Sequence, residues 1–163
     1  TQAMVAELDA ALANFADAAG KCDDARYPGA GAAGGLGFAF KAFLGGELKR
    51  GIEIVLDVTR FAEYAAAADV VVTGEGRLDA QTAMGKAPVG VAAVAKRFGK
   101  KVVAFAGALG EGAEAVNAHG IDAFFPILRS ITTLEAALDK ATAAANLSAT
   151  VEQVFRVLKM QEK

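Results

Sequence analysis

Short, wholly apolar segments separated by helical patterns dominate the second half of the sequence. Val70, Val71 and Val72 form a β-branched run that ends at Thr73 and Gly74. Fully apolar runs of this length are typical of parallel strands, because helices cover both faces of a parallel sheet. The expected strands are residues 70–72, 102–106 and 122–126, and helices are expected over residues 88–98, 114–118 and 132–158. This order predicts right-handed parallel βαβ units from about residue 69 onward.

The first half of the sequence has a different pattern. Apolar residues recur at helical spacing in residues 1–20 and 36–44, and a glycine-rich stretch occupies residues 29–35 between them. Residues 51–59 fit a strand or a helix, and we favour a helix. The whole chain is therefore expected to be an α/β protein whose second half is Rossmann-like.

Three strands make a thin sheet with two exposed apolar edges. Such edges pair readily with other chains, so we expect further strands from another segment of a parent chain or from another subunit. The sequence also begins at Thr1 without an initiator Met. Both features lead us to expect a fold that is incomplete relative to its parent.

Charge and composition exclude several classes of function. Among 163 residues, 17 Lys and Arg face 19 Asp and Glu, so no global positive field would attract nucleic acid. The single Cys22 cannot form an internal disulfide or a cysteine zinc site, which favours a reducing cytoplasm. No uncharged apolar run reaches the roughly 18 residues that a membrane span requires. We therefore expect a cytoplasmic protein that binds neither membranes nor nucleic acid.

The segment after the first expected strand, residues 73–86, carries most of the candidate chemistry. Ligands of open parallel sheets bind beyond the carboxyl ends of the strands. Arg77 can hold an anion with two hydrogen bonds, and Lys86 precedes a helix N-terminus, which also attracts anions. Glu75 and Asp79 can hold Mg²⁺ or accept a proton from a hydroxyl group. These groups suit phosphoryl transfer, and the alternative is a solvated loop whose charges pair with each other.

Two familiar nucleotide-binding motifs fail here. A Walker A loop requires Gly-x-x-x-x-Gly-Lys-Ser/Thr, but Ala80 stands at the first glycine position and Ala87 follows Lys86. Residues 29–34 match Gly-x-Gly-x-x-Gly, but a polar segment ending in Pro28 precedes them where a strand is required. The remaining expectation is a glycine-rich loop that offers backbone N–H groups to an anion or, equally, allows close helix packing.

Longer strings of the sequence resemble the bacterial glycerate kinase family. The strings are PGAGAAGGLG, VVTGEGRLDAQTAMGKAPVGVA, VVAFAGALG and HGIDAFFPIL, and the resemblance covers essentially the whole chain. It implies ATP-dependent phosphorylation of D-glycerate, giving 2-phosphoglycerate in most bacterial members and 3-phosphoglycerate in some glycerate kinases. Mg²⁺ would accompany ATP, and Asp79 is our candidate metal ligand.

The resemblance also implies an organisation. Family members have one Rossmann-like domain built from both ends of the chain and a second domain in the middle, with the active site between them. Residues 1–68 would belong to the second domain and residues 69–163 to the Rossmann-like one. The family's N-terminal half would be the missing partner, and a homodimer is a further expectation. The positions that match the family's signature and glycine-rich segments are Gly74, Glu75, Gly76, Arg77, Asp79, Gln81, Thr82 and Lys86, and Gly29, Gly31, Gly34 and Gly35.

Two further hypotheses come from other functional classes. The chain can be a non-catalytic domain that binds an anion or a nucleotide, or a structural remnant that folds with a partner segment and binds no ligand. The catalytic hypothesis places Glu75, Arg77, Asp79 and Lys86 in the reaction, and the glycines, Gln81 and Thr82 in binding of substrate or phosphate.

Overall fold

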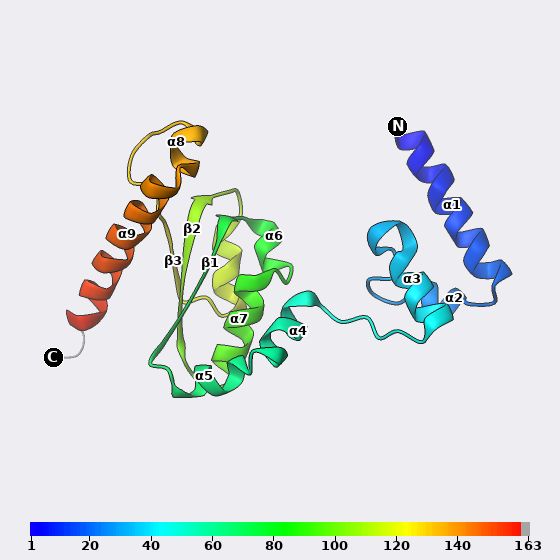
Figure 1. The fold of residues 1–163 in the computed structure, drawn as a ribbon, viewed down its shortest axis with the longest axis horizontal. Helices are drawn as coiled ribbons and strands as arrows, with labels where there is room; N and C mark the ends of the chain where they lie inside the picture. Colours follow the sequence, from blue (N-terminus) through cyan, green and yellow to red (C-terminus); the bar gives the residue numbers. More distant parts are fainter. Residues whose placement is uncertain (161–163) are drawn as a thin grey trace. The chain divides into compact units, whose positions relative to one another are not determined.

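The computed structural model describes residues 1–160, which divide into two compact units at Arg50 and Gly51 (Figure 1). Each unit has its own buried apolar cluster. This division comes before the boundary expected at residues 68 and 69, because residues 51–67 form helices that pack in the sheet-containing unit. The assignment of residues 1–68 to a separate domain of a parent fold stays a prediction.

The first unit contains three helices, α1 (Gln2–Ala18), α2 (Cys22–Ala25) and α3 (Ala32–Leu44). Phe15, Phe38 and Phe43 pack ring against ring, with centroids 5.7–6.0 Å apart. The first turn of α3 is irregular, because Ala33, Gly34 and Gly35 all have left-handed backbone angles. The regular helix therefore starts where the apolar pattern predicts it, at about residue 36.

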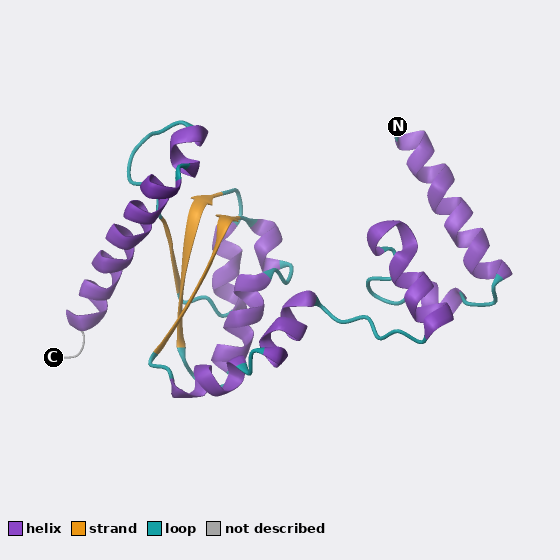
Figure 2. Cartoon of the chain, in the orientation of Figure 1, coloured by secondary structure: helices purple, strands orange, loops and turns teal. Residues whose placement is uncertain are grey.

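The second unit is built around a parallel sheet of three strands in the order β1, β2, β3 (Figure 2). The strands are β1 (Val70–Leu78), β2 (Lys101–Leu109) and β3 (Ala123–Pro126). Val70 pairs with Lys101 and Leu78 with Leu109, so β1 and β2 run together over their whole length. All three strands were predicted, and the parallel arrangement confirms the expected α/β class.

Helices cover both faces of this sheet, as the apolar strands require (Figure 1). Alternate residues of β2 point to opposite faces. Val102 and Ala104 are buried in the cluster that includes residues of α5 (Phe61–Ala67), α7 (Ala87–Lys96) and η1 (Ala113–His119). Val103 and Phe105 pack with Val154 of α9 (Lys140–Met160) on the other face. The remaining helices of this unit are α4 (Gly51–Val58), α6 (Ala80–Ala83) and α8 (Leu134–Leu138).

The first strand is longer than predicted. Residues 75–78 were expected to begin a polar loop, but they continue β1 and pair with the far end of β2. Backbone pairing with a buried neighbouring strand overrides the polar sequence at this point, and the side chain of Leu78 is fully buried. Glu75 and Arg77 therefore lie on a rigid strand.

The last helical region was predicted as one helix and contains two. Asp139 has an extended backbone between α8 and α9, and its side chain accepts hydrogen bonds from the N–H and hydroxyl groups of Thr142. Such local bonds compete with the helical ladder, which explains the break. The helix was expected to begin at residue 132, but α8 begins at Leu134, and the side chain of its N-cap residue Thr133 accepts a hydrogen bond from Ala136 N.

Asp122 ties the start of β3 to the start of β2. Its Oδ2 accepts hydrogen bonds from Lys96 Nζ at 2.5 Å and from Val102 N at 2.7 Å. The backbone N–H of Asp122 donates to Val102 O at 2.9 Å. Burial raises the pKa of the Asp122 carboxyl, but the bonds from Lys96 and Val102 favour the ionised form more strongly and bring the pKa below its ordinary value.

We expect Asp122→Asn to lower the free energy of unfolding by about 1 kcal/mol at neutral pH, because a partly exposed charged pair and its backbone bond are weakened. A lowered pKa in the folded state means that the carboxylate stabilises the fold above its ordinary pKa of 3.8. This contribution is lost as the pH falls through the lowered value. Urea unfolding of both proteins between pH 7 and pH 2.5 measures the difference.

Asp57→Asn is the matched control, because Asp57 is an exposed carboxylate on α4 with no ion pair among residues 1–160. It should shift stability by less than about 0.5 kcal/mol at any pH in that range. If the difference in unfolding free energy between Asp122→Asn and the unmodified protein grew below pH 4, that result would contradict the account.

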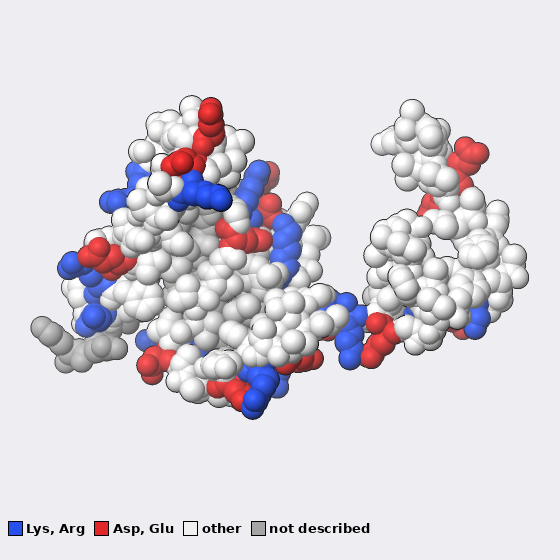
Figure 3. Space-filling view, viewed as in Figure 1, with Lys and Arg blue, Asp and Glu red and all other residues white. Residues whose placement is uncertain are grey.

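Charged side chains of both signs are interspersed on the face drawn in Figure 3. This agrees with the near balance of 17 basic and 19 acidic residues. Within residues 1–160, no helix combines the length and the apolar character that crossing a membrane requires.

Candidate functional site

The candidate site lies where β1 ends and α6 begins, at the carboxyl edge of the sheet. Glu75 and Arg77 are residues of β1, and Asp79 follows the strand directly. Lys86 is the N-cap residue of α7, which starts with Pro88 in its first turn. Strand, turn and two helix N-termini thus hold four charged side chains on well-defined backbone.

Asp79 is the centre of this cluster. Its carboxylate caps α6 by accepting a hydrogen bond from Gln81 N at 3.0 Å. Arg77 Nε lies 3.9 Å from Asp79 Oδ2, and Lys86 Nζ lies 3.6 Å from Asp79 Oδ1. Both carboxylate oxygens therefore face a cation. The Asp79 side chain is about one quarter exposed, whereas those of Arg77 and Lys86 are 66% and 42% exposed and remain accessible to an anion.

Glu75 is held by a different partner. The hydroxyl group of Thr82 donates a short hydrogen bond to Glu75 Oε1. The same hydroxyl oxygen accepts a bond from Asp79 N at 3.2 Å. Thr82 is fully buried, so it supports Glu75 from beneath the surface of the site. Among residues 1–160, Glu75 forms no ion pair.

The loop after β2 closes against this cluster. Gly110 N donates to Leu78 O at 2.6 Å, and Ala80 N donates to Glu111 O at 3.0 Å. A Cβ added at Gly110 would lie 2.8 Å from Arg77 Nε and 2.9 Å from Asp79 Cβ. Arg77 and Asp79 occupy their places because residue 110 has no side chain. Gly110 was not among the predicted site residues, because the second strand was expected to end at residue 106 and instead runs on to Leu109.

The predicted site residues divide between the two units. Glu75, Arg77, Asp79, Thr82 and Lys86 come together as described. Gln81 is exposed and contributes its backbone N–H to the cap of α6.

The two predicted glycines of β1 differ in their surroundings. A Cβ at Gly74 would lie 2.2 Å from Phe105 O, whereas a Cβ at Gly76 would meet open space. Gly74 thus serves close strand pairing, and its predicted part in ligand binding stays a prediction.

The glycine-rich segment belongs to the first unit. Gly29, Gly34 and Gly35 have positive φ angles, and Gly31 is the N-cap residue of α3. Ala32 N and Gly35 N donate to carbonyl groups within the segment, at 3.0 and 3.3 Å. These two N–H groups are already paired, so an anion would have to use others. Binding by the four glycines stays a prediction.

The donor atoms suit Mg²⁺ better than a softer metal. No group of three or more His, Cys, Asp and Glu side chains gathers within the described part of the chain. Mg²⁺ is commonly held by one or two carboxylates together with substrate phosphates. Glu75 and Asp79 supply two such carboxylates, but Arg77 and Lys86 compete for the oxygens of Asp79.

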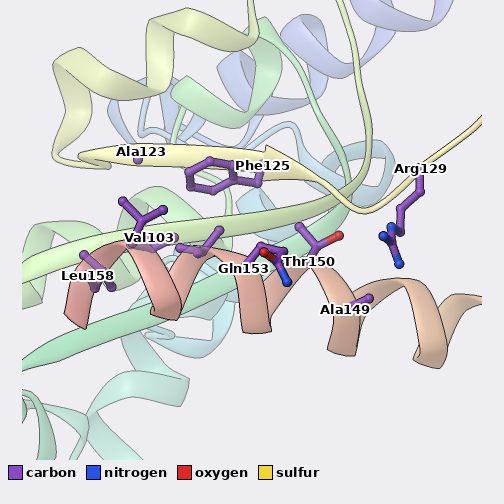
Figure 4. Close-up of a pocket in the computed structure, with 10 residues that line it drawn as sticks. Val103, Ala123, Phe125, Arg129, Ala149, Thr150, Gln153 and Leu158 are labelled. Carbon is purple, nitrogen blue, oxygen red and sulfur yellow. The ribbon is translucent and has the colours of Figure 1, made fainter. Parts of the chain in front are cut away.

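A hollow of about 480 Å³ lies between α9 and the strands β2 and β3 (Figure 4). Val103, Phe125, Val154 and Leu158 give it an apolar lining, and Arg129 stands near one end. An apolar lining does not compensate the desolvation of a phosphate or a carboxylate. The charged cluster at the end of β1 is therefore the better candidate for an anionic substrate.

Comparison with known proteins assigns the chain to a family. Residues 1–159 match the model of the glycerate kinase family. The chain is 48% identical over 160 residues to a glycerate kinase of Bacillus cereus, and 45% identical over 159 residues to a glycerate 2-kinase of Escherichia coli. These matches cover 96% and 93% of the chain, but only 42% of each relative.

The structural comparison agrees. A crystal structure from Salmonella typhimurium LT2, assigned as glycerate kinase 2, superposes with a TM-score of 0.60 at 46% identity. The match covers 82% of this chain and 33% of that one. The chain thus spans about two fifths of the length of the curated relatives that it matches. On the strength of the family model and these relatives, the chain belongs to the glycerate kinase family.

Proposed function

We propose that this chain acts as the C-terminal part of an ATP-dependent kinase that converts D-glycerate to 2-phosphoglycerate. The observation that carries the proposal is the cluster at the end of β1, where the accessible cations of Arg77 and Lys86 lie 3.9 and 3.6 Å from the carboxylate of Asp79. Family membership makes glycerate the substrate of choice, since relatives are named glycerate kinase and glycerate 2-kinase.

In the proposed reaction, the C2 hydroxyl oxygen of glycerate bonds to the γ-phosphorus of ATP while the bond from that phosphorus to the ADP oxygen breaks. Arg77 and Lys86 offset the negative charge of the transferring group or of the glycerate carboxylate. Glu75 or Asp79 accepts the hydroxyl proton. Mg²⁺, held by a carboxylate of this pair and by the nucleotide phosphates, would supply further charge neutralisation.

The proposal includes a partner and a compartment. Along the described strands, β1 and β3 each have one unpaired edge, which suits strands from the N-terminal half that the longer relatives possess. Alternatively, a second copy of the chain in a homodimer would cover these strand edges.

We place the enzyme in the cytoplasm, where its substrates D-glycerate and ATP are available and a single free Cys22 stays reduced.

Two assays separate catalysis from simple binding. Purified parent enzyme should release ADP only when both D-glycerate and Mg-ATP are present, and isothermal titration should detect each ligand. Binding of D-glycerate or of Mg-ATP without ADP release would favour the alternative, a non-catalytic anion- or nucleotide-binding domain. Absence of both binding and turnover would contradict both functions.

Gly110→Ala tests whether the loop after β2 shapes the site. The added Cβ would displace Arg77 and Asp79, so we expect kcat/KM for D-glycerate to fall about tenfold, the cost of roughly 1.4 kcal/mol of transition-state binding. Steady-state kinetics on the parent enzyme measure the change. The control is Gly51→Ala at the start of α4, where a Cβ meets open space and kinetics should not change. Equal kinetics for Gly110→Ala and the unmodified enzyme would contradict this part of the site.

A further inference from the structure

Thr82 is a polar residue next to the charged cluster, and its side chain is fully buried. This burial distinguishes it from the other candidate residues of the cluster. Glu75 and Asp79 are partly exposed, and Gln81 and Lys86 are exposed. A side chain without exposed surface cannot contact a substrate that arrives from solvent. Any part that Thr82 takes in the reaction must therefore pass through a neighbouring group.

The hydrogen bonds of Thr82 determine what that group is. A hydroxyl group has one proton to donate and lone pairs to accept. Asp79 N donates to Thr82 Oγ1, so the hydroxyl proton is left for Glu75 Oε1, which is the acceptor that the structure shows. This arrangement requires an acceptor at Glu75 and restrains its carboxylate to one orientation.

The two carboxylates of the cluster are consequently not equivalent. Asp79 accepts a hydrogen bond from Gln81 N and lies near Arg77 and Lys86. Its carboxylate oxygens therefore already have partners, the N-terminus of α6 and the two cations. Glu75 uses Oε1 for Thr82, and among residues 1–160 no ion pair engages its carboxylate. Glu75 is thus the carboxylate with an oxygen to offer a substrate.

We infer that Thr82 is a positioning residue that orients Glu75, and that Glu75 rather than Asp79 accepts the proton of the reacting hydroxyl group. The inference rests on the proposed kinase function and chooses between the two carboxylates that this function leaves open. Thr82 thereby leaves the set of ligand-binding residues. Its hydroxyl fixes the carboxylate before substrate arrives, and fixed orientation is what a positioned base contributes.

The first test uses kinetics of the parent enzyme. Thr82→Val keeps the volume of the side chain and removes its hydroxyl, and we expect kcat to fall at least about tenfold, as is usual when a supporting hydrogen bond is lost. Thr82→Ser keeps the hydroxyl and should stay within about threefold of the unmodified enzyme. The KM for ATP should change less than twofold in both variants, because the Thr82 side chain is fully buried and has no surface to offer a nucleotide. A Thr82→Ser variant as slow as Thr82→Val would overturn the inference.

A double variant separates positioning from a merely structural role. Once Glu75→Gln has removed the base, adding Thr82→Val should lower kcat no further, because the two residues act through one group. Thr59→Val is the matched control, since the hydroxyl of Thr59, just after α4, donates to Val55 O of that helix at 2.8 Å and should not affect kcat. A multiplicative loss in the double variant, or an unchanged kcat in Thr82→Val, would contradict the inference.

Crystal structures of the Thr82 variants of the parent enzyme give a readout that needs no turnover. The Glu75 carboxylate should leave its position in Thr82→Val and keep it in Thr82→Ser. If the unmodified enzyme shows no glycerate-dependent ADP release, the kinase proposal fails, whereas a displaced Glu75 would still support Thr82 as its positioning residue. An unmoved Glu75 in Thr82→Val would overturn the positioning role even in an active enzyme.

Discussion

Gly74→Ala is expected to destabilise the sheet-containing unit by about 3 kcal/mol or more, which is at the upper end for overpacking. A Cβ at this position would lie 2.2 Å from the carbonyl oxygen of Phe105 in the neighbouring strand. Backbone atoms of a buried strand cannot rotate away as the end of a long side chain can. Removing this clash therefore requires β1 and β2 to separate. The pairing of the two strands, which runs from Val70 opposite Lys101 to Leu78 opposite Leu109, would be disturbed.

Gly76→Ala provides the control within the same strand. A Cβ at Gly76 meets open space, and the φ of Gly76 is not positive, so an alanine should fit without strain. We expect its thermal midpoint to stay close to that of the unmodified protein, and that of Gly74→Ala to fall by many degrees. Differential scanning calorimetry on the parent enzyme measures both. Equal stability of the two variants would show that the strand spacing described here is wrong.

Lys86→Ala is expected to have the largest effect on turnover, with kcat reduced about a hundredfold, the usual cost of losing one group that stabilises charge in the transition state. Its ammonium group lies 3.6 Å from Asp79 Oδ1 and is accessible to an anion. The variant removes that charge from the N-terminus of α7 and leaves Arg77 as the nearest cation to Asp79. Stopped-flow or coupled ADP assays at saturating substrates measure kcat directly.

Lys101→Ala removes the same charge at the opposite end of the sheet. Lys101 is exposed at the start of β2, far along the strand from the site at the end of β1. Its kcat should match that of the unmodified enzyme. If Lys86→Ala also retained normal kcat, Lys86 would have no part in the reaction.

The architecture was largely predictable because its signals are local. Short apolar runs marked each strand, and the helix with Pro88 in its first turn was recognised from start signals that need no tertiary contact. The continuation of β1 through Leu78 was not predictable in this way. Polar residues 75 and 77 suggest a loop, and only pairing with β2 shows that they are strand residues.

The candidate site was predicted as a set of residues, and the structure shows how some of them are arranged. Sequence reasoning placed Glu75, Arg77, Asp79 and Lys86 near one another, because strand ends and helix N-termini converge at one edge of a parallel sheet. Burial of Thr82 and the close approach of Gly110 depend on tertiary packing between α6 and the loop after β2. No sequence pattern carries that information.

The most direct test of the central claim is ³¹P NMR of a reaction that contains parent enzyme, D-glycerate and Mg-ATP, run beside Lys86→Ala. We predict that 2-phosphoglycerate appears as ATP disappears, with one product formed for each ADP, and that the variant forms it about a hundredfold more slowly. A spectrum of 3-phosphoglycerate would contradict the assigned hydroxyl, and ATP that remains intact in the presence of glycerate would contradict the kinase function itself.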